Sequence, residues 1–71
     1  MTEKVFAARL TQLRTVKGWT KQQLADAVGV SRASVSYWEM ARNWPKVSEL
    51  IVLATVLDCS TDWLLGLVDP P

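Results

Sequence analysis

The chain opens with apolar residues at helical spacing. Phe6, Leu10 and Leu13 stand at positions i, i+4 and i+7, and Lys17 continues the same face. This spacing places side chains on one face of an α-helix. Gly18 then suits the end of the helix, because glycine readily adopts the left-handed conformation that follows many helices. The pattern predicts a first helix that packs one stripe against a core.

Two shorter helical patterns follow, joined by a tight turn. Thr20 and Gln23 have the spacing of a capping box at the start of a second helix. Ser31 can cap a third helix, and Gly29 between the two can take a positive φ angle. Two short helices joined by a glycine-containing turn form the signature of a helix-turn-helix.

The rest of the chain predicts a loop and two more helices. Trp44 precedes Pro45, which favours an extended backbone, so residues 40–46 are expected to form a loop. Apolar residues then recur at helical spacing, and Ser60 can cap a last short helix. The sequence therefore predicts a compact, all-α, five-helix fold in one domain over residues 1–71. The helices are expected over about residues 3–17, 21–28, 32–39, 47–57 and 61–67.

The composition argues against an enzyme. The chain has no histidine, which is the commonest general base and the commonest metal ligand. Paired-cysteine metal motifs and glycine-rich phosphate loops are absent as well. The single cysteine, Cys59, has no partner for an intrachain disulfide and is expected to be a small core residue. We therefore expect no catalytic site, cofactor, metal or small-molecule ligand.

Nothing in the sequence suggests a membrane or a secretory route. Every apolar run is shorter than the roughly 18 residues that a membrane span requires. The chain does not open with a basic segment followed by an apolar one. A lone cysteine also fits a reducing compartment, so we expect a cytoplasmic protein.

The charges are distributed unevenly, although the formal net charge is only +1. Residues 1–48 hold all eight Lys and Arg residues and three acidic residues, a balance of +5. Residues 49–71 hold four acidic residues and no basic residue. This asymmetry indicates a basic face for an anionic partner and an acidic end directed away from it. An uneven but merely solvated surface is the alternative.

Segments along nearly the whole chain, from about Phe6 to Gly66, follow one recognisable order. They are Arg14, Thr-Lys-Gln-Gln-Leu-Ala at 20–25, Val-Gly-Val-Ser at 28–31, Val-Ser-Tyr-Trp-Glu at 35–39, Pro45, Leu53-Ala54, Leu57 and Thr-Asp-Trp-Leu-Leu at 61–65. In order and spacing these segments resemble the Cro/C1-type helix-turn-helix family, which includes lambda-like phage repressors, Cro proteins and many bacterial regulators. The resemblance implies a lambda-repressor-like domain that binds double-stranded DNA in a bacterial cytoplasm or a phage-infected host.

Three positions depart from the family pattern. Lys21 stands where the family usually has glutamine, which leaves a phosphate or base contact of the family open. Ala41 replaces the usual glycine after the third helix, and Lys46 replaces the usual serine cap before the fourth. These two departures are expected to affect mainly the geometry of the loop.

Arg14 and Glu39 lie on inward-facing stripes of the first and third helices. In the family this pair forms a buried ion pair that ties the two helices together. The resemblance implies the same pair here, and the alternative is two separate surface charges.

The third helix is expected to turn one face to the core and the opposite face to DNA. Val35 and Trp38 take the core face. Arg32 has the planar fork that suits guanine O6 and N7, and Ala33 can contact a thymine methyl group. The alternatives are a phosphate contact for Arg32, sugar-phosphate packing for Tyr37, and no contact for the small residues. The candidate base contacts are Arg32, Ala33, Ser36 and Tyr37.

Phosphate contacts are expected on both sides of the third helix. The free amides that open the second helix suit a phosphate by dipole and by charge, and basic residues of the loop suit the other flank. Arg9 and Lys17 are weaker candidates, and each charge could equally be only solvated. The phosphate candidates are Thr20, Lys21, Ser31, Arg42 and Lys46.

The expected fifth helix has more apolar side chains than a small domain needs to bury. Trp63, Leu67 and Val68 are therefore expected to contact a second copy of the chain, whereas Leu64 is expected in the core. Packing of all four within the monomer is the alternative. A twofold dimer would set two recognition helices one helical turn of DNA apart, roughly 34 Å.

The sequence as a whole favours a phage- or prophage-type repressor that binds a near-palindromic operator as a homodimer. An antitoxin or a housekeeping regulator of the same fold is the first alternative. The second is a protein-interaction module that has lost DNA binding, against which the basic first part of the chain argues. Seventy-one residues suit a stand-alone Cro-like protein, whereas the final Pro-Pro would suit a domain that precedes a linker.

Overall fold

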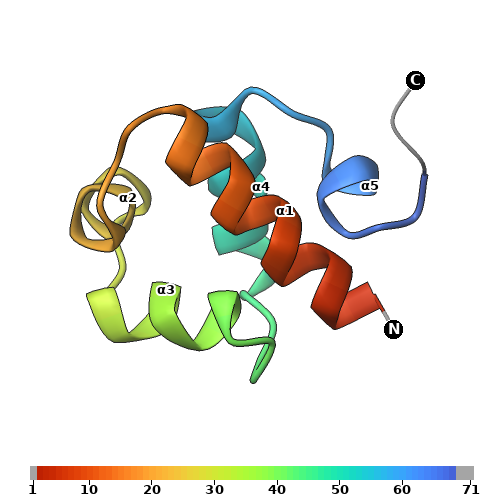
Figure 1. Ribbon diagram of the computed structural model, residues 1–71, viewed down its shortest axis with the longest axis horizontal. Helices are drawn as coiled ribbons and strands as arrows, with labels where there is room; N and C mark the ends of the chain where they lie inside the picture. Colours follow the sequence, from red (N-terminus) through yellow and green to blue (C-terminus); the bar gives the residue numbers. More distant parts are fainter. Residues whose placement is uncertain (1, 69–71) are drawn as a thin grey trace.

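The computed structural model describes residues 2–68, and within this range every regular element is an α-helix (Figure 1). The chain forms a first long helix, two short helices, a fourth helix of intermediate length and a final single turn. The helices are α1 Thr2–Val16, α2 Lys21–Val28, α3 Arg32–Glu39, α4 Val47–Leu57 and α5 Thr61–Leu64.

The limits of α2, α3 and α4 confirm the sequence prediction, whereas α5 is shorter than predicted. Gly66 has a φ angle of +79° and donates its N–H to the Trp63 carbonyl at 3.0 Å, while Leu67 donates to the Asp62 carbonyl at 2.9 Å. This pair of bonds is the Schellman motif, which ends a helix. The prediction that the helix continues to residue 67 was therefore wrong. The first helix also ends one residue early, so Lys17 lies outside it.

The side-chain caps predicted for α2 and α3 are present. The Thr20 hydroxyl accepts the Gln23 N–H at 3.1 Å, and the Gln23 side chain accepts the Thr20 N–H at 2.8 Å. The Ser31 hydroxyl accepts the Ser34 N–H at 3.2 Å. Gly29 ends α2 with a φ angle of +85°, which allows the sharp turn into α3.

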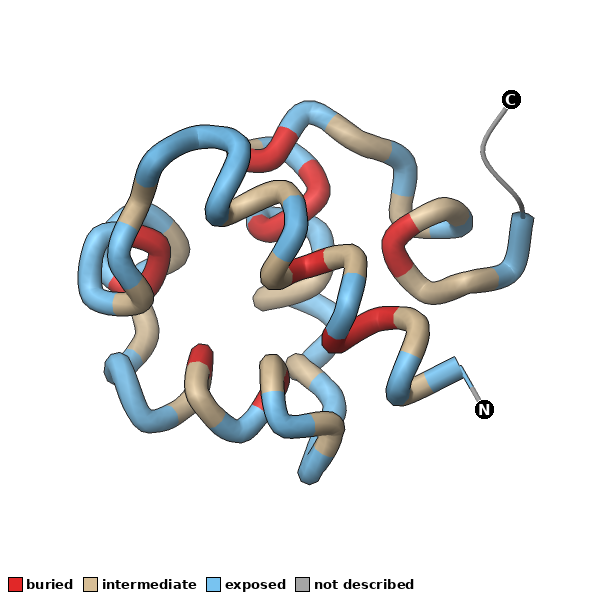
Figure 2. Tube along the Cα trace, viewed as in Figure 1, coloured by how far each residue is buried: buried red, intermediate tan, exposed pale blue. Residues whose placement is uncertain are grey.

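The core lies between α1 and the two short helices and extends to α4 and α5 (Figure 2). α3 packs against α1 and α2, while α5 packs against α1 and α4. The buried apolar side chains thus come from all five helices, and Cys59 packs beside them only partly buried. The largest fully buried side chains are Phe6, Leu10, Leu24, Leu53, Leu64 and Val35.

The turn after α3 carries an unusual backbone conformation for an alanine. Ala41 has a φ angle of +58° and donates its N–H to the Trp38 carbonyl at 3.1 Å, while Arg42 donates to the Tyr37 carbonyl at 3.0 Å. An L-residue with a Cβ atom costs about 1–2 kcal/mol in this left-handed region. Ala41, which stands where the family usually has glycine, therefore holds a strained backbone conformation.

Replacing Ala41 by glycine should stabilise the fold. The change removes the Cβ strain but makes the unfolded chain more flexible, so we expect a net gain of about 0.5–1 kcal/mol in the free energy of unfolding. Urea unfolding followed by circular dichroism measures it. Ala27→Gly is the matched control, because Ala27 is exposed within α2 and the same change there should cost about 1 kcal/mol. An Ala41→Gly variant less stable than the parent would contradict the strain assigned to this turn.

Candidate nucleic-acid interface

The outer face of α3 presents the residues that the sequence predicted as base contacts. Val35 and Trp38 are buried on the inner face, at 0% and 2% exposure. Arg32, Ala33 and Tyr37 are exposed, whereas Ser36 is half-buried and less accessible than predicted. α3 forms one edge of the molecule, and the segment that follows α5 lies on the other side (Figure 1). One helix face with a guanidinium group near its N-terminus is thus free to enter a groove.

Arg14 and Glu39 fix α3 against α1. The Arg14 Nε donates to Glu39 Oε2 at 2.7 Å and its Nη2 to Oε1 at 3.1 Å, which is a bidentate ion pair. The third donor, Nη1, reaches the Trp19 carbonyl at 2.8 Å. The hydrogen bond to Glu39 raises the pKa of Arg14, although burial opposes this. Because the two side chains are only 15% and 5% exposed, water competes weakly for the pair.

The start of α2, a helix that packs against α3, holds two predicted phosphate contacts. Lys21 is half-buried at the first helical position, and Thr20 is exposed. The Thr20 and Ser31 oxygens already accept a backbone N–H, as described for the caps. The Thr20 hydroxyl hydrogen therefore remains as a donor for an anion, beside the unpaired amides at the N-terminus of α2. The Ser31 hydroxyl also lies 3.2 Å from the Ser34 hydroxyl, and either group can donate in that hydrogen bond.

The loop after α3 carries two further predicted phosphate contacts. Arg42 and Lys46 are both exposed. The Glu49 carboxylate accepts the Lys46 N–H at 2.8 Å, which is one half of a capping box, but no side-chain oxygen takes the place of the missing serine cap. The Trp44 ring packs on Phe6, with a centroid distance of 5.4 Å. The sequence predicted Trp44 only as a loop residue. The one feature that could have indicated a role for it is its position, as an aromatic residue between two basic residues.

Two basic residues that were weaker phosphate candidates have partners within the domain. The Arg9 guanidinium lies 4.7 Å from the centroid of the Trp63 ring and donates to the carbonyls of Trp63 and Val68. Lys17 lies over the Trp19 ring at 5.1 Å. Arg9 therefore holds the segment after α5 against α1, which the sequence did not indicate, because the partners are more than fifty residues away.

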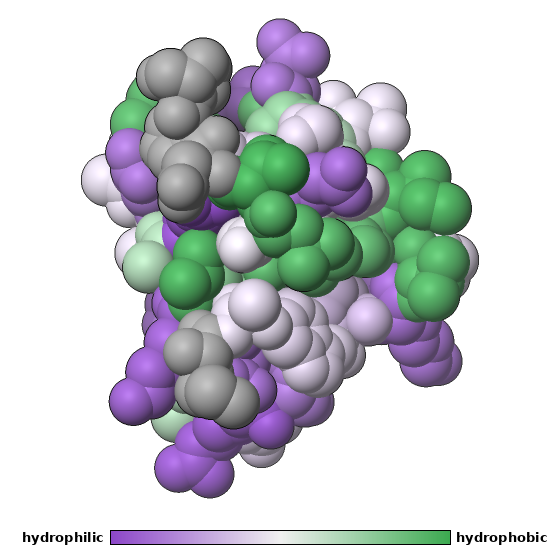
Figure 3. Space-filling model, turned by 90° about the vertical axis from the view of Figure 1, so that its right-hand side faces the viewer, coloured by the Kyte–Doolittle hydropathy of each residue, from purple (hydrophilic) through white to green (hydrophobic). Residues whose placement is uncertain are grey.

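The apolar residues after α5 are partly free. Leu67 and Val68 are 63% and 47% exposed, whereas Trp63 is half-buried and its ring is covered in part by Arg9. Figure 3 shows apolar side chains gathered in a band across this end of the molecule. The exposed residues Val47, Ile51 and Val52 of α4 add apolar surface that the sequence did not predict.

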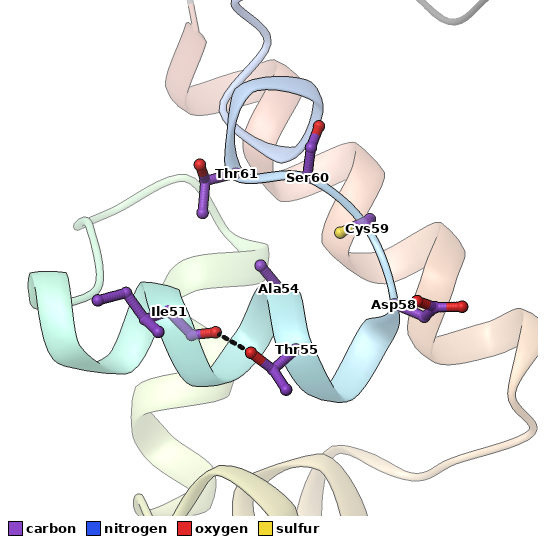
Figure 4. A pocket seen from close by; sticks show the side chains of 7 residues that line it. All are labelled: Ile51, Ala54, Thr55, Asp58, Cys59, Ser60 and Thr61. Atoms are coloured by element: carbon purple, nitrogen blue, oxygen red, sulfur yellow. Dashed lines mark hydrogen bonds between the residues drawn. The ribbon is translucent and has the colours of Figure 1, made fainter.

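A shallow groove lies between α4 and the start of α5 (Figure 4). Cys59 lines it, and burial together with the neighbouring Asp58 carboxylate raises the pKa of its thiol. No cluster of His, Cys, Asp or Glu within residues 2–68 could hold a metal ion. No helix in the same range has the length and apolar character that crossing a membrane requires. The groove is lined by Ile51, Ala54, Thr55, Asp58, Cys59, Ser60 and Thr61.

Together, the capped pair α2–α3, the tight turn at Gly29 and the free outer face of α3 define a helix-turn-helix domain. A family model described as helix-turn-helix matches residues 10–64 of the chain. The chain belongs to this family, in its Cro/C1-type branch, whose members are DNA-binding transcriptional regulators.

Relatives and solved structures agree with this assignment. The uncharacterized HTH-type transcriptional regulator YobD of Bacillus subtilis is 36% identical over 67 residues, which cover 94% of this chain and 60% of that protein. The P22 c2 repressor in complex with a synthetic operator superimposes with a TM-score of 0.82 at 30% identity, over 84% of this chain and 91% of that one. The restriction-modification controller protein C.AhdI from Aeromonas hydrophila superimposes with a TM-score of 0.79 at 32% identity, over 87% of this chain and 94% of that one. The chain thus spans less than two thirds of the curated relative YobD.

The Arg14–Glu39 ion pair predicts that the effects of the two residues on the free energy of unfolding are coupled. Replacing either residue by methionine leaves the other charge poorly solvated, and we expect a loss of about 3 kcal/mol in the free energy of unfolding. The double replacement removes both charges and should recover much of that loss. Urea unfolding of the two single variants and the double variant measures the coupling. Asp26→Ala, which breaks only the exposed hydrogen bond with Gln22, is the control and should change stability by less than about 0.5 kcal/mol. Small, additive losses would show that the pair is solvated.

Proposed function

We propose that the chain is a sequence-specific repressor of the phage or prophage type, which binds a near-palindromic DNA operator as a dimer. The observation that carries the proposal is the outer face of α3. It is largely exposed, has Arg32 near its N-terminus and is flanked by the basic residues Lys21, Arg42 and Lys46. The major groove of DNA admits an α-helix, and residues near the start of that helix reach base edges. The similarity to the P22 c2 repressor, which was solved with an operator, supports the same mode.

In this proposal α3 reads the sequence and the flanking groups fix the register. Arg32 donates two hydrogen bonds to a guanine, and Ala33 contacts a thymine methyl group. Tyr37 and Ser36 lie further along the same face, where Tyr37 reaches a base edge and the half-buried Ser36 bonds a base or a phosphate. The phosphate contacts carry no sequence information and come from Thr20, Lys21, Ser31, Arg42 and Lys46.

The charge distribution supports the same orientation. Residues 1–48 carry a balance of +5 and include α2, α3 and the loop after α3. The acidic residues Asp58 and Asp62 lie at the end of α4 and in α5, while α3 packs mainly against α1 and α2. Glu49 lies in the first turn of α4, and Asp69, the fourth acidic residue of this half, lies outside the described residues. DNA is thus attracted to the α3 side of the domain. The protein would act in the cytoplasm of a bacterium or of a phage-infected host.

The second copy is proposed to contact the segment after α5. Leu67 and Val68 expose apolar side chains there, and Trp63 lies at the edge of the same segment. A contact formed by so short a segment buries less than a standard interface of about 1,600 Å². The free dimer is therefore weak, and DNA promotes it by holding two subunits on adjacent half-sites.

Arg32 and Arg42 separate base reading from phosphate binding. Arg32→Ala should cost about 1–3 kcal/mol on the specific site and relax the preference at one base pair per half-site. Arg42→Ala should weaken binding to all sequences alike and reduce the log–log salt slope by about 0.9 for each phosphate that the variant no longer neutralises. Fluorescence anisotropy on specific and random duplexes at several salt concentrations measures both. If Arg32→Ala leaves the base preferences intact, α3 does not read the operator through this residue.

Leu67→Glu tests the dimer contact. Leu67 is 63% exposed, so the monomer should stay folded, and circular dichroism checks this. A charge at the contact should abolish cooperative binding to a full operator and spare the weak binding to a half-site. Sedimentation velocity with and without operator measures the stoichiometry, and Val16→Glu, at a 78% exposed position on α1, is the matched control. Two-to-one binding of undiminished affinity by Leu67→Glu would place the dimer contact elsewhere, with the loop from Arg42 to Lys46 the next candidate.

A further inference from the structure

The loop between α3 and α4 is held firmly at its two ends. At the first end the Arg42 N–H donates to the Tyr37 carbonyl at 3.0 Å. At the other end the Lys46 N–H donates to the Glu49 carboxylate at 2.8 Å. Between these points, residues 43–45 make no backbone hydrogen bond to any described residue. Pro45 restricts the backbone of Trp44 and its own φ angle, and the remaining constraint on the path of the middle of the loop is side-chain packing.

The Trp44 ring supplies that packing. It lies against the Phe6 ring of α1, with a centroid distance of 5.4 Å and an interplanar angle of 39°. Phe6 is fully buried, whereas Trp44 is 45% exposed, so one side of the indole contacts the core while the rest faces solvent. Tilted aromatic pairs at this separation attract each other beyond the simple burial of area.

Trp44 stands midway between the two basic residues of the loop. Arg42 precedes it by two residues and Lys46 follows it by two, and both are exposed. A ring fixed to α1 therefore limits how far either charged residue can move relative to α3, because α1 is itself tied to α3 by the core and by Arg14. Without the ring packed on Phe6, the three residues between the hydrogen-bonded ends would be free to take other paths.

We propose that Trp44 is a positioning residue, which anchors the loop to α1 so that Arg42 and Lys46 meet the DNA phosphates that flank the site read by α3. This inference rests on the proposed function for its DNA contact. It assigns to Trp44 no contact with a base and none with a phosphate. The indole acts through its stacking on Phe6, so another aromatic ring can replace it.

The anchoring itself is tested without DNA. Trypsin cleaves after Arg42 and Lys46, and native digestion reports how often the loop leaves its place. Trp44→Ala should speed cleavage at these two bonds about tenfold, whereas Trp44→Phe should leave it within about twofold of the parent. Cleavage after Lys17, which lies in the separate turn after α1, is the internal control and should not change. If Trp44→Ala does not fold, as judged by circular dichroism, Trp44→Leu takes its place, since it keeps apolar bulk but has no ring.

The DNA role is tested with two duplexes, one selected from a random pool by the parent chain and one of random sequence. Trp44→Ala should weaken binding to both by the same factor, about tenfold, and lower the log–log salt slope by about 0.9 for each phosphate that is no longer neutralised. It should leave the selected base preferences unchanged. In the background of Arg42→Ala and Lys46→Ala together, Trp44→Ala should have no further effect.

Three results would overturn the inference. Trp44→Phe could lower the affinity as much as Trp44→Ala, which would mean that the indole N–H contacts DNA directly. Trp44→Ala could alter the base preferences, or lower the affinity by an independent factor in the background that lacks both basic side chains. If selection with the parent chain enriches no duplex and the random duplex is not bound either, the proposed function fails and the DNA role of Trp44 fails with it. The trypsin digestion still decides whether the ring anchors the loop.

Discussion

The position of α3 depends on the ion pair of Arg14 with Glu39. α3 has only eight residues, and isolated helices shorter than about 12–15 residues are marginal in water. It is therefore held by what it packs against. Val35 and Trp38 bury its inner face, while the bidentate ion pair fixes its C-terminal end to α1. The same guanidinium also binds the Trp19 carbonyl. One side chain thus joins α1, the turn that leads to α2, and the end of α3.

The turns of the molecule also help to fix the positions of the helices. Each helix is followed by a residue in the left-handed conformation, which stops the helix and sends the chain back across the core. Because the connections are short, the relative placement of α2 and α3 follows from local backbone geometry as well as from packing. These residues are Gly18, Gly29, Ala41, Asp58 and Gly66.

The sequence predicted most of this fold because its signals are local. Caps at Thr20, Ser31 and Ser60 marked helix starts, and the spacing of apolar residues marked the faces. It missed the end of α5, where apolar composition favoured a longer helix. Gly66 carries the local signal for this end, because its left-handed conformation stops the helix in a Schellman motif. The fold adds a second requirement for glycine, since a Cβ atom at Gly66 would lie only 2.8 Å from the Cγ1 atom of Val5 in α1.

The parts of the candidate site that depend on local spacing were also predictable from the sequence. The exposed face of α3 follows from helical spacing alone, and three of its four predicted residues are exposed. The roles of Arg9 and Trp44 were not predictable, because each depends on a partner far away in the sequence: Trp63 and Val68 for Arg9, and Phe6 for Trp44. A basic residue in a sequence signals a charge, and only the fold shows whether that charge has a partner within the domain.

We propose that α3, held by this framework, reads a DNA sequence. Selection of bound duplexes from a random DNA pool tests it most directly, because one experiment gives the site, its symmetry and its spacing. We expect one enriched, near-palindromic site whose half-sites have their centres about 10 base pairs apart, which is one helical turn. Recovery of unenriched sequences from the pool, at an affinity that depends only on salt, would contradict it.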